Sequence, residues 1–369
     1  MHLKDEFTRL TIIFVLWNIG LALAGSVLFP AFVDMGFTIE NMLLFGTLCF
    51  LFPLILLLFF RDYTSKIAMP LGILSVALAY SALVLIGGFT GVILLYVIGA
   101  FSFFLFWVPF NAFWFDLKNK KTAGHGTIYN AIMTIISLAM PAFSGFIAQQ
   151  FGFDLVFTIT IMILVFAAIV AIKLAPEKKV SINFSKSLRV LNGFRTLFFL
   201  EGIHHIAAVF ILVIITIQYF PKPAEFGLFM SLATILSVFS AFFLSKLSDA
   251  TGHRNKFIFF SALGIAFSTV FAAFADNLVM WFIAVSLVNF FRVIFFPFPL
   301  ALMLDKKKNS LELMYSREIF LNLGRSFGGI VSLILYLFTG NLTLPLLFTG
   351  LSMFAYAGIF EFIKSKKIG

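Results

Sequence analysis

Five ionisable side chains stand inside long apolar runs of this sequence, and they are its first candidates for chemistry. They are Glu201, His204, His205, Arg292 and Arg325. Histidine has an ordinary pKa of about 6.5, so Glu201, His204 and His205 form a candidate group for carrying protons. A guanidinium binds carboxylate or phosphate through two parallel hydrogen bonds, so the arginines are candidates for binding an anion.

The two arginines end polar stripes at helical spacing. The stripes are Ser286, Asn289 and Arg292 on one run, and Glu318, Asn322 and Arg325 on another. Residues three or four apart share a helix face, so each stripe must face a protein interior or a water-filled cavity rather than lipid. Asn322 could also bridge Glu318 and Arg325 in a purely structural network, which leaves two roles open for Arg325. Adjacent residues on a helix point about 100° apart, so at most one of His204 and His205 faces a cavity.

Elements that cross a membrane must position these side chains. The chain has 369 residues, of which 62% are hydrophobic and 11% charged, with 54 Phe and a mean hydropathy of +1.08. This composition excludes a soluble protein, and apolar runs of about 20 residues predict membrane helices rather than barrel strands. The single cysteine, Cys49, excludes a disulfide framework and a cysteine-based metal site. The run that starts at Leu10 is long enough to be a span, so we do not expect a signal peptide there.

Twelve spans are predicted, six on each side of a polar break. The first six are Leu10–Val33, Met42–Phe60, Ile67–Gly87, Gly91–Phe115, Gly126–Gln149 and Phe153–Leu174. The second six are Thr196–Phe220, Phe226–Leu247, Phe257–Phe274, Leu278–Leu304, Leu313–Phe338 and Leu342–Ile363. The fold class expected is therefore an all-α polytopic membrane protein.

The basic residues orient these spans. With the N-terminus inside, 23 of the 26 Lys and Arg fall in inner segments, Arg317 among them, and only Lys222 falls outside. Basic residues stay on the cytoplasmic side of a membrane, so both termini are predicted to be cytoplasmic in a multi-pass protein of the cell membrane. The same bias explains the net charge of +10, and nothing indicates a nucleic-acid partner.

An internal repeat divides the chain into two pseudo-symmetric halves. We expect a six-helix bundle over residues 1–175, a cytoplasmic linker over 176–195, and a second six-helix bundle over 196–369. A shift of about 188 residues places Asp62 on Asp249 and Asp116 on Asp305, each just after an even-numbered span. Duplicated halves around a central site are the usual architecture of secondary transporters.

The loop after the eighth span carries a recognisable motif. Ser245, Asp249, Gly252 and Arg254 resemble the loop signature of the major facilitator superfamily, in which a carboxylate and basic residues at a tight turn favour one access state. Asp62 is the remnant of the first-half copy. These five residues are the candidate conformational latch.

A second motif lies in the fifth span. Met140-Pro141 followed by Ser144-Gly145 is similar to a motif of proton-coupled exporters in the superfamily, although two of the usual glycines are replaced. Helix packing eased by proline and small residues explains this patch equally well.

The resemblance implies that the first, fourth, seventh and tenth spans line a central cavity. It points to Arg292 as a cavity residue, and the repeat places His205 and His204 opposite Asn18 and Trp17. The expected substrate-binding residues are Trp17, Asn18, His205, Asn289, Arg292 and Arg325. The expected proton-coupling residues are Glu201, His204, His205 and Glu318.

The sequence therefore predicts a secondary active transporter of a small organic solute, favouring an organic anion, that works by alternating access. Proton coupling, as symport or antiport, is a further hypothesis, and a hydrophobic drug or cation exporter of the same fold is the alternative. A lipid-modifying membrane enzyme using Glu201, His204 and His205 lacks a second catalytic cluster, and a non-transporting receptor stays open. We expect a monomer without cofactor or metal. The sequence contains no phosphate-binding loop, so we do not expect ATP-driven transport by this chain.

Overall fold

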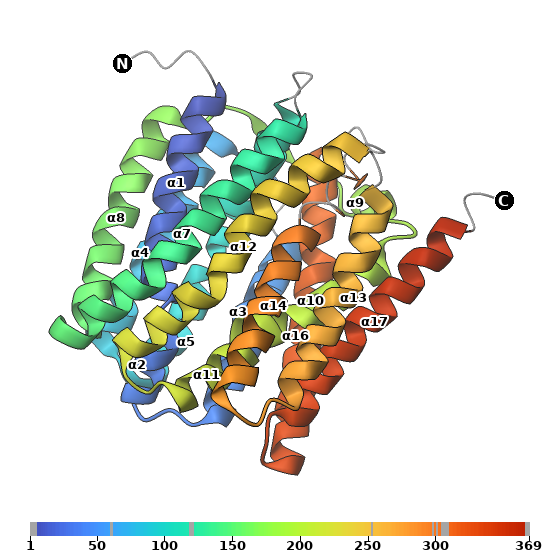
Figure 1. Ribbon diagram of the computed structural model, residues 1–369. Coiled ribbons are helices and arrows are strands. Elements are labelled where there is room, and N and C mark those ends of the chain that lie inside the picture. Colours follow the sequence, from blue (N-terminus) through green and yellow to red (C-terminus); the bar gives the residue numbers. More distant parts are fainter. Residues whose placement is uncertain are drawn as a thin grey trace.

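The computed structural model describes residues 6–59, 62–117, 122–251, 254–296, 299, 302–303 and 310–365, and only the backbone of 122–127, 239–251, 254 and 365. Within these ranges, eleven helical segments are long and apolar enough to cross a membrane. A twelfth, Pro223–Val238, is apolar but shorter, and it belongs to a helix of 29 residues. The described chain is thus an all-α polytopic membrane fold with helices on all twelve predicted spans (Figure 1).

The helices follow the predicted spans closely. In the first half they are α1 (Glu6–Gly25) with α2 (Leu28–Asp34), α3 (Ile39–Phe59), α4 (Ser65–Ile86), α5 (Gly88–Gly99) with η1 (Phe103–Trp107) and α6 (Val108–Asp116), α7 (Thr122–Phe151) and α8 (Phe153–Leu174). In the second half they are α10 (Arg195–Ile206) with η2 (Ala207–Ile211) and α11 (Leu212–Tyr219), α12 (Pro223–Thr251), α13 (Arg254–Ala273), α14 (Leu278–Phe295), α16 (Ser310–Thr339) and α17 (Thr343–Ser365).

Glycines with positive φ make the tightest turns between spans. Gly87 has φ 64° and ends α4, and Gly152 has φ 85° and separates α7 from α8. Glycine adopts this backbone conformation without the strain that a Cβ atom would cause. The third and fourth spans, which are hard to separate in the sequence, are therefore divided at Gly87.

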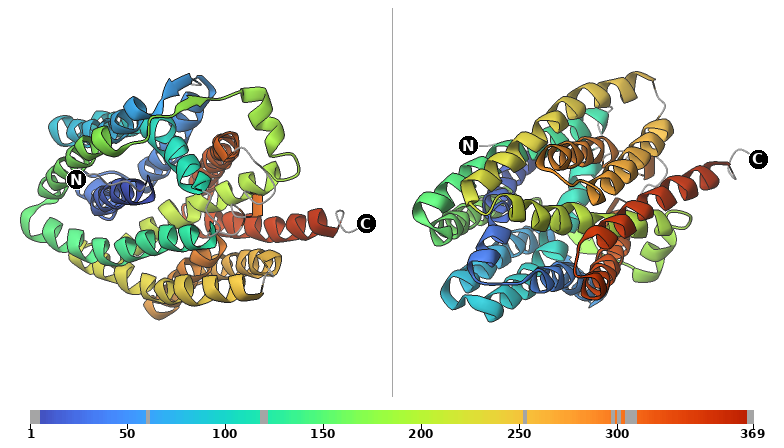
Figure 2. Two further views of the ribbon diagram at one scale, coloured as in Figure 1. Left: turned by 90° about the horizontal axis from the view of Figure 1, so that it is seen from above. Right: turned by 60° about the horizontal axis from the view of Figure 1, so that its bottom comes forward.

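The predicted linker over 176–195 is partly ordered and pairs with a loop of the first half. The strand β2 (Lys179–Ser181) runs antiparallel to β1 (Asp62–Thr64), which lies between α3 and α4, and a short helix, α9 (Phe184–Val190), follows. Figure 2 shows the two strands side by side at the end of the bundle near the N-terminus. We call this end the connector end.

Two buried hydrogen bonds reinforce the pairing of these strands. Ser65 Oγ donates to the carbonyl of Pro176 at 2.6 Å and accepts from the N–H of Lys178 at 3.0 Å. In β1, Tyr63 donates from its hydroxyl to the carbonyl of Phe104 at 2.5 Å, inside the π-helical turn η1. Burial raises the pKa of Tyr63 above its usual value, so the hydroxyl stays protonated and able to donate.

Close helix crossings join segments far apart in the sequence. α7 lies beside α12, and α3 and α10 both pack against α16. Figure 1 shows α7 and α12 running next to each other along their length. An added Cβ at Gly227 of α12 would lie 2.0 Å from the carbonyl oxygen of Pro141 in α7, and one at Gly145 would lie 2.3 Å from that of Pro223. This arrangement supports the packing explanation of the motif in the fifth span.

At the connector end, α16 is also held by hydrogen bonds to the first half. The hydroxyl of Tyr315 donates to the carbonyl of Leu57 at the end of α3. The hydroxyl of Ser310 donates to the carboxylate of Asp116 at the end of α6. The first turns of α16 are therefore fixed to two helices of the first half.

Candidate functional site

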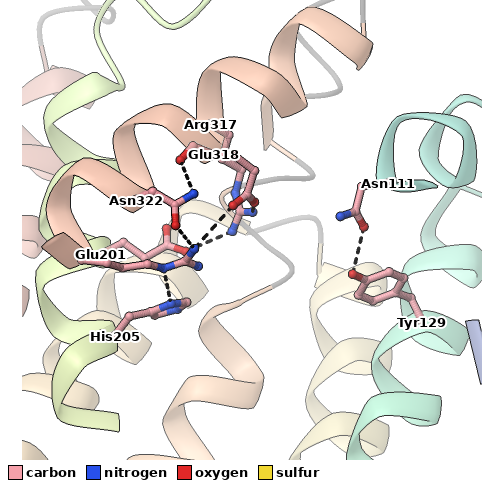
Figure 3. A network of polar contacts seen from close by, with 8 residues as sticks. Asn111, Tyr129, Glu201, His205, Arg317, Glu318 and Asn322 are labelled. Carbon is pink, nitrogen blue, oxygen red and sulfur yellow. Dashed lines mark hydrogen bonds and ion pairs between the residues drawn. The ribbon is translucent and has the colours of Figure 1, made fainter. Parts of the chain in front are cut away.

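A charged network is buried between α10 and α16. Arg317 pairs with Glu201 at 3.1 Å and with Glu318 at 3.0 Å, and Arg325 pairs with Glu318 at 3.4 Å. Each of these side chains is less than a tenth exposed. Figure 3 shows Glu201, Arg317 and Glu318 pointing toward one another from the two helices.

Two uncharged side chains complete this network. Arg325 donates from one terminal nitrogen to Oδ1 of Asn322 at 3.1 Å and from Nε to Nδ1 of His205 at 3.0 Å. Asn322 donates in turn to the carbonyl of Glu318 at 2.8 Å. Because a guanidinium can only donate, His205 must be unprotonated at Nδ1. We call Glu201, His205, Arg317, Glu318, Asn322 and Arg325 the arginine network.

The charges of the arginine network balance. It contains two guanidiniums and two carboxylates, and His205 adds none when it accepts from Arg325. Aromatic faces cover the cations, since Arg325 lies 4.9 Å from the ring centre of Phe50 and Arg317 lies 5.4 Å from that of Phe198. The network is thus neutral and largely closed to solvent.

Two arginines of this network were assigned other places or roles from the sequence. Arg317 was counted among the basic residues of the inner segments; it lies in α16 and is buried, because this helix starts at Ser310 and protein covers its first turns. Arg325 was expected to bind substrate; its guanidinium contacts Glu318, Asn322 and His205, and its role in binding stays a prediction. The alternative structural role for Arg325, bridged by Asn322, matches these contacts.

A separate cavity lies between α7, α12 and α14. Its volume is about 210 Å³. Seven of its ten described lining residues are polar: Asn130, Thr134, Ser137, Thr234, Ser237, Asn289 and Arg292; the other three are Met133, Val293 and Phe296. We call this space the Arg292 cavity.

Arg292 is the one cation in the described lining of this cavity. The side chain is partly exposed, and among the described residues it forms no ion pair or hydrogen bond. Asn289, one turn earlier on α14, lines the same space. Within the described part of the chain, Arg292 thus differs from Arg317 and Arg325, whose charges are paired.

Phe296 separates the Arg292 cavity from the arginine network. It lines the cavity one helical turn after Arg292, and the centre of its ring lies 5.4 Å from the guanidinium carbon of Arg317. Arg317 also keeps its Nε buried without a hydrogen-bond partner in the described part of the chain. One aromatic ring thus lies between the cavity that contains Arg292 and the neutral arginine network.

Other predicted site residues lie elsewhere. Trp17 is buried against Phe106, with ring centres 4.3 Å apart, and Asn18 donates to the carbonyl of Phe14 in its own helix at 2.7 Å. His204 contacts Thr269 through Nε2 at 3.0 Å. None of Trp17, Asn18, His204 and His205 lines the Arg292 cavity.

The candidate latch is only partly described. Asp62 lies in β1, where its carboxylate accepts a hydrogen bond from Ser181 of the connector at 2.6 Å. Ser245 and Asp249 belong to α12 and Arg254 begins α13, but their side chains and Gly252 lie outside the described residues. The contacts of Asp62 are thus with the connector strand.

Five polar cavity residues that were not predicted from the sequence form two helical stripes. Asn130, Thr134 and Ser137 are spaced four and three residues apart on α7. This is the same periodicity that identified the stripes in the tenth and eleventh spans. Thr234 and Ser237 add a shorter stripe on α12, so spacing alone could have indicated these two faces.

An uncharged pair faces the network from the first half. The hydroxyl of Tyr129 on α7 donates to Oδ1 of Asn111 on α6 at 2.9 Å, and both side chains are buried. In Figure 3 this pair lies across from Glu201 and Arg317.

Among the described residues there is no group of three His, Cys, Asp or Glu that could hold a metal ion.

Comparison with known proteins identifies the family and the fold. Residues 125–309 match the family model of the Major Facilitator Superfamily, and no curated protein matches the sequence. The structure is similar to that of the human organic anion transporter MFSD10 (TETRAN), with a TM-score of 0.73 and 12% identity over 96% of this chain and 100% of that one. It is also similar to a POT family transporter in complex with 5-aminolevulinic acid, with a TM-score of 0.75 and 11% identity over 98% of this chain and 96% of that one. A POT family transporter with a thioalcohol-conjugated peptide gives a TM-score of 0.74 at 11% identity over the same shares of the two chains.

Proposed function

Because this chain belongs to the major facilitator superfamily, we propose that it is a secondary transporter that carries a small organic anion by alternating access. Two six-helix halves, residues 1–175 and 196–369, would move against each other around a site at mid-depth. The family and the transporter neighbours favour transport over catalysis.

The observation that carries the proposal is the guanidinium of Arg292, which lies in a polar cavity and has no ion pair or hydrogen bond among the described residues. Even partial removal of a cation from water costs free energy, and a bound carboxylate or phosphate would offset that cost. The neighbouring arginine network is neutral, so it does not cancel the positive potential of the cavity. Asn289 and Asn130 provide amide groups that can donate to or accept from the same ligand.

The size of the cavity favours a small solute. At roughly 30 Å³ per water molecule, its volume corresponds to about seven waters. Pockets for drug-sized ligands usually measure about 300 to 1,000 Å³. A metabolite with a single acidic group fits this space better than a large amphiphile or drug.

Proton coupling is part of the proposal and involves the arginine network rather than the cavity. Glu201, Glu318 and His205 are its titratable members, and His204 lies beside it on α10. Uptake of a proton by Glu318 would leave two guanidiniums facing a single carboxylate. The resulting repulsion would favour a different arrangement of α10 and α16.

Ligand binding to the purified protein tests the anion site. A thermal-shift screen of carboxylates and phosphate esters, with tetraphenylphosphonium as a lipophilic cation, would identify ligands of the folded state. Loss of a charged hydrogen bond in Arg292→Gln should weaken anion binding by about 1.5 to 3 kcal/mol.

Two variants control this experiment. Arg292→Lys should keep part of the affinity, because it keeps the charge but loses the two-fold hydrogen bonding of a guanidinium. Lys222→Gln removes an exposed positive charge, paired with Glu225, that lies outside the cavity, and should change nothing. Tight binding of tetraphenylphosphonium that is unchanged or improved in Arg292→Gln would reject the anion site and favour the cation exporter.

A further inference from the structure

In its described lining, the Arg292 cavity offers one positive charge and two threonines whose hydroxyl protons are already in use. Thr134 donates from its hydroxyl to the carbonyl of Asn130 at 2.7 Å, and Thr234 donates to that of Met230 at 2.8 Å. A hydroxyl that donates within its own helix still has an oxygen lone pair to offer. Toward the cavity, both threonines can therefore act only as hydrogen-bond acceptors.

This pattern restricts the second polar group of a ligand. A carboxylate at physiological pH is acceptor-only, so it pairs with Arg292 and cannot satisfy Thr134 and Thr234. The group that faces the threonines must donate. An ammonium donates, but it would place a positive charge in the same small cavity as the guanidinium of Arg292, whereas a neutral hydroxyl donates without that repulsion.

The number of charges on the ligand is limited by Phe296. Its ring covers Arg317 from the cavity side, and both carboxylates that contact Arg317 neutralise it within the network. A second anionic group in the cavity would consequently lose its hydration without gaining a second cation.

Building on the proposed anion site, we infer that the Arg292 cavity selects a small hydroxylated monocarboxylate, and that Phe296 is the residue that excludes dianions. The carboxylate pairs with Arg292 and the hydroxyl groups donate to Thr134 and Thr234. Phe296 is a specificity-determining residue because it keeps Arg317 out of reach of the ligand.

Four probes of similar chain length separate these features. Gluconate carries one carboxylate and several hydroxyls, glucarate adds a second carboxylate, hexanoate lacks the hydroxyls, and sorbitol lacks the carboxylate. Calorimetric binding to purified protein should rank gluconate first, with each of the others weaker by about tenfold or more, the factor expected for one unsatisfied polar group.

Variants at two phenylalanines test the role of the wall. Phe296→Ala opens Arg317 and its unpartnered Nε to the cavity, so the preference for gluconate over glucarate should fall by about tenfold. Phe198→Ala is the matched control, because Phe198 also lies 5.4 Å from Arg317 but does not line the cavity. Phe198→Ala should leave the preference unchanged, and an equal loss in both variants would overturn the role of Phe296.

The outcomes distinguish this inference from the proposed function. Binding of an anion that is unaffected by Arg292→Gln would reject the anion site itself. Binding that requires Arg292 but favours glucarate over gluconate, or hexanoate over gluconate, would overturn only the inferred selectivity. Failure of all four probes to bind would overturn the assignment to a small hydroxylated monocarboxylate.

Discussion

Arg325 donates a hydrogen bond from Nε to Nδ1 of His205, 3.0 Å away, across the crossing of α10 and α16. Protonation at Nδ1 and this bond exclude each other, because a protonated imidazole has no lone pair to accept with. The pair therefore links the proton occupancy of one span to the position of a charge on another.

Replacing His205 tests whether this bond makes transport sensitive to pH. Asparagine keeps an acceptor near the position of Nδ1 but cannot take up a proton. In liposomes, we expect the transport rate of His205→Asn to vary less between about pH 6 and 8 than that of the unsubstituted protein. His204→Asn, whose histidine contacts Thr269 outside the network, should keep the full dependence. Identical pH profiles for all three proteins would show that His205 does not make transport sensitive to pH.

Glu318→Gln tests the charge balance of the arginine network. Glu318 contacts both Arg317 and Arg325, so its neutralisation leaves two buried guanidiniums with one carboxylate. Breaking a buried pair in this way costs about 3 to 5 kcal/mol, measured as the loss of unfolding free energy in detergent. Glu361→Gln removes an exposed pair with Lys364 and should cost about 0.5 kcal/mol or less. Equal small losses in the two variants would show that the buried contacts add no stability.

The crossing of α7 and α12 should not tolerate a methyl group at Gly227. The added Cβ would lie 2.0 Å from the carbonyl oxygen of Pro141, so the two helices would have to separate. Overpacking of this kind costs about 1 to 3 kcal/mol in thermal unfolding. Gly358→Ala, at a helical glycine with no atom within 4 Å of the new Cβ, should be neutral or stabilising. Comparable losses in both variants would mean that the contact does not limit the packing.

Ser65→Ala should loosen the connector. The hydroxyl of Ser65 is buried and bonds both the carbonyl of Pro176 and the N–H of Lys178. Its loss leaves these backbone groups unsatisfied, and trypsin should cleave near Lys178 about tenfold faster. Ser81→Ala removes only a bond to a carbonyl of its own helix, so its cleavage rate should match that of the unsubstituted protein. A slow rate in Ser65→Ala as well would mean that the strand pairing alone holds the connector.

The predicted topology can be tested with single cysteines in a Cys49→Ser background. Ser185 is exposed on α9 at the connector end, and Asn341 is exposed in the turn between α16 and α17 at the other end. If the connector faces the cytoplasm, an impermeant thiol reagent added to intact cells should label Asn341→Cys but not Ser185→Cys. Labelling of Ser185→Cys but not Asn341→Cys would show that the connector faces the outside of the cell.

The spans could be predicted because lipid leaves a strong signature in the sequence. A helix that crosses a membrane must be apolar over about 20 residues, so the twelve runs and their breaks appear without knowledge of any neighbour. The start of α16 was predicted too late, at Leu313 rather than Ser310, because its first turns carry charged residues. These turns are covered by protein rather than by lipid, so they do not need an apolar composition.

The pairing of charges could not be predicted in the same way. The helix that lies opposite Arg292 or Arg325 decides whether its guanidinium finds a partner among the described residues. Arg317 and Glu201, which form an ion pair, are 116 positions apart in the sequence. Both arginines end polar stripes of the same kind, yet one faces a cavity and the other faces Glu318 and His205. Spacing identifies the face of a helix that is polar, but packing decides what that face meets.

The connector also sets a limit on how far the halves can separate at its end. Ser181 is fixed to Asp62 of the first half through the strand pairing, and Lys186 contacts Glu312 of α16 at 2.9 Å. The chain between Ser181 and Lys186 can span roughly 18 Å when fully extended, and less while α9 remains helical. An opening wider than this tether must break the contact of Lys186 with Glu312 or peel β2 from β1. The backbone from Ser181 to Lys186, together with the side chains of Lys186 and Glu312, thereby limits how far this end can open while both contacts last.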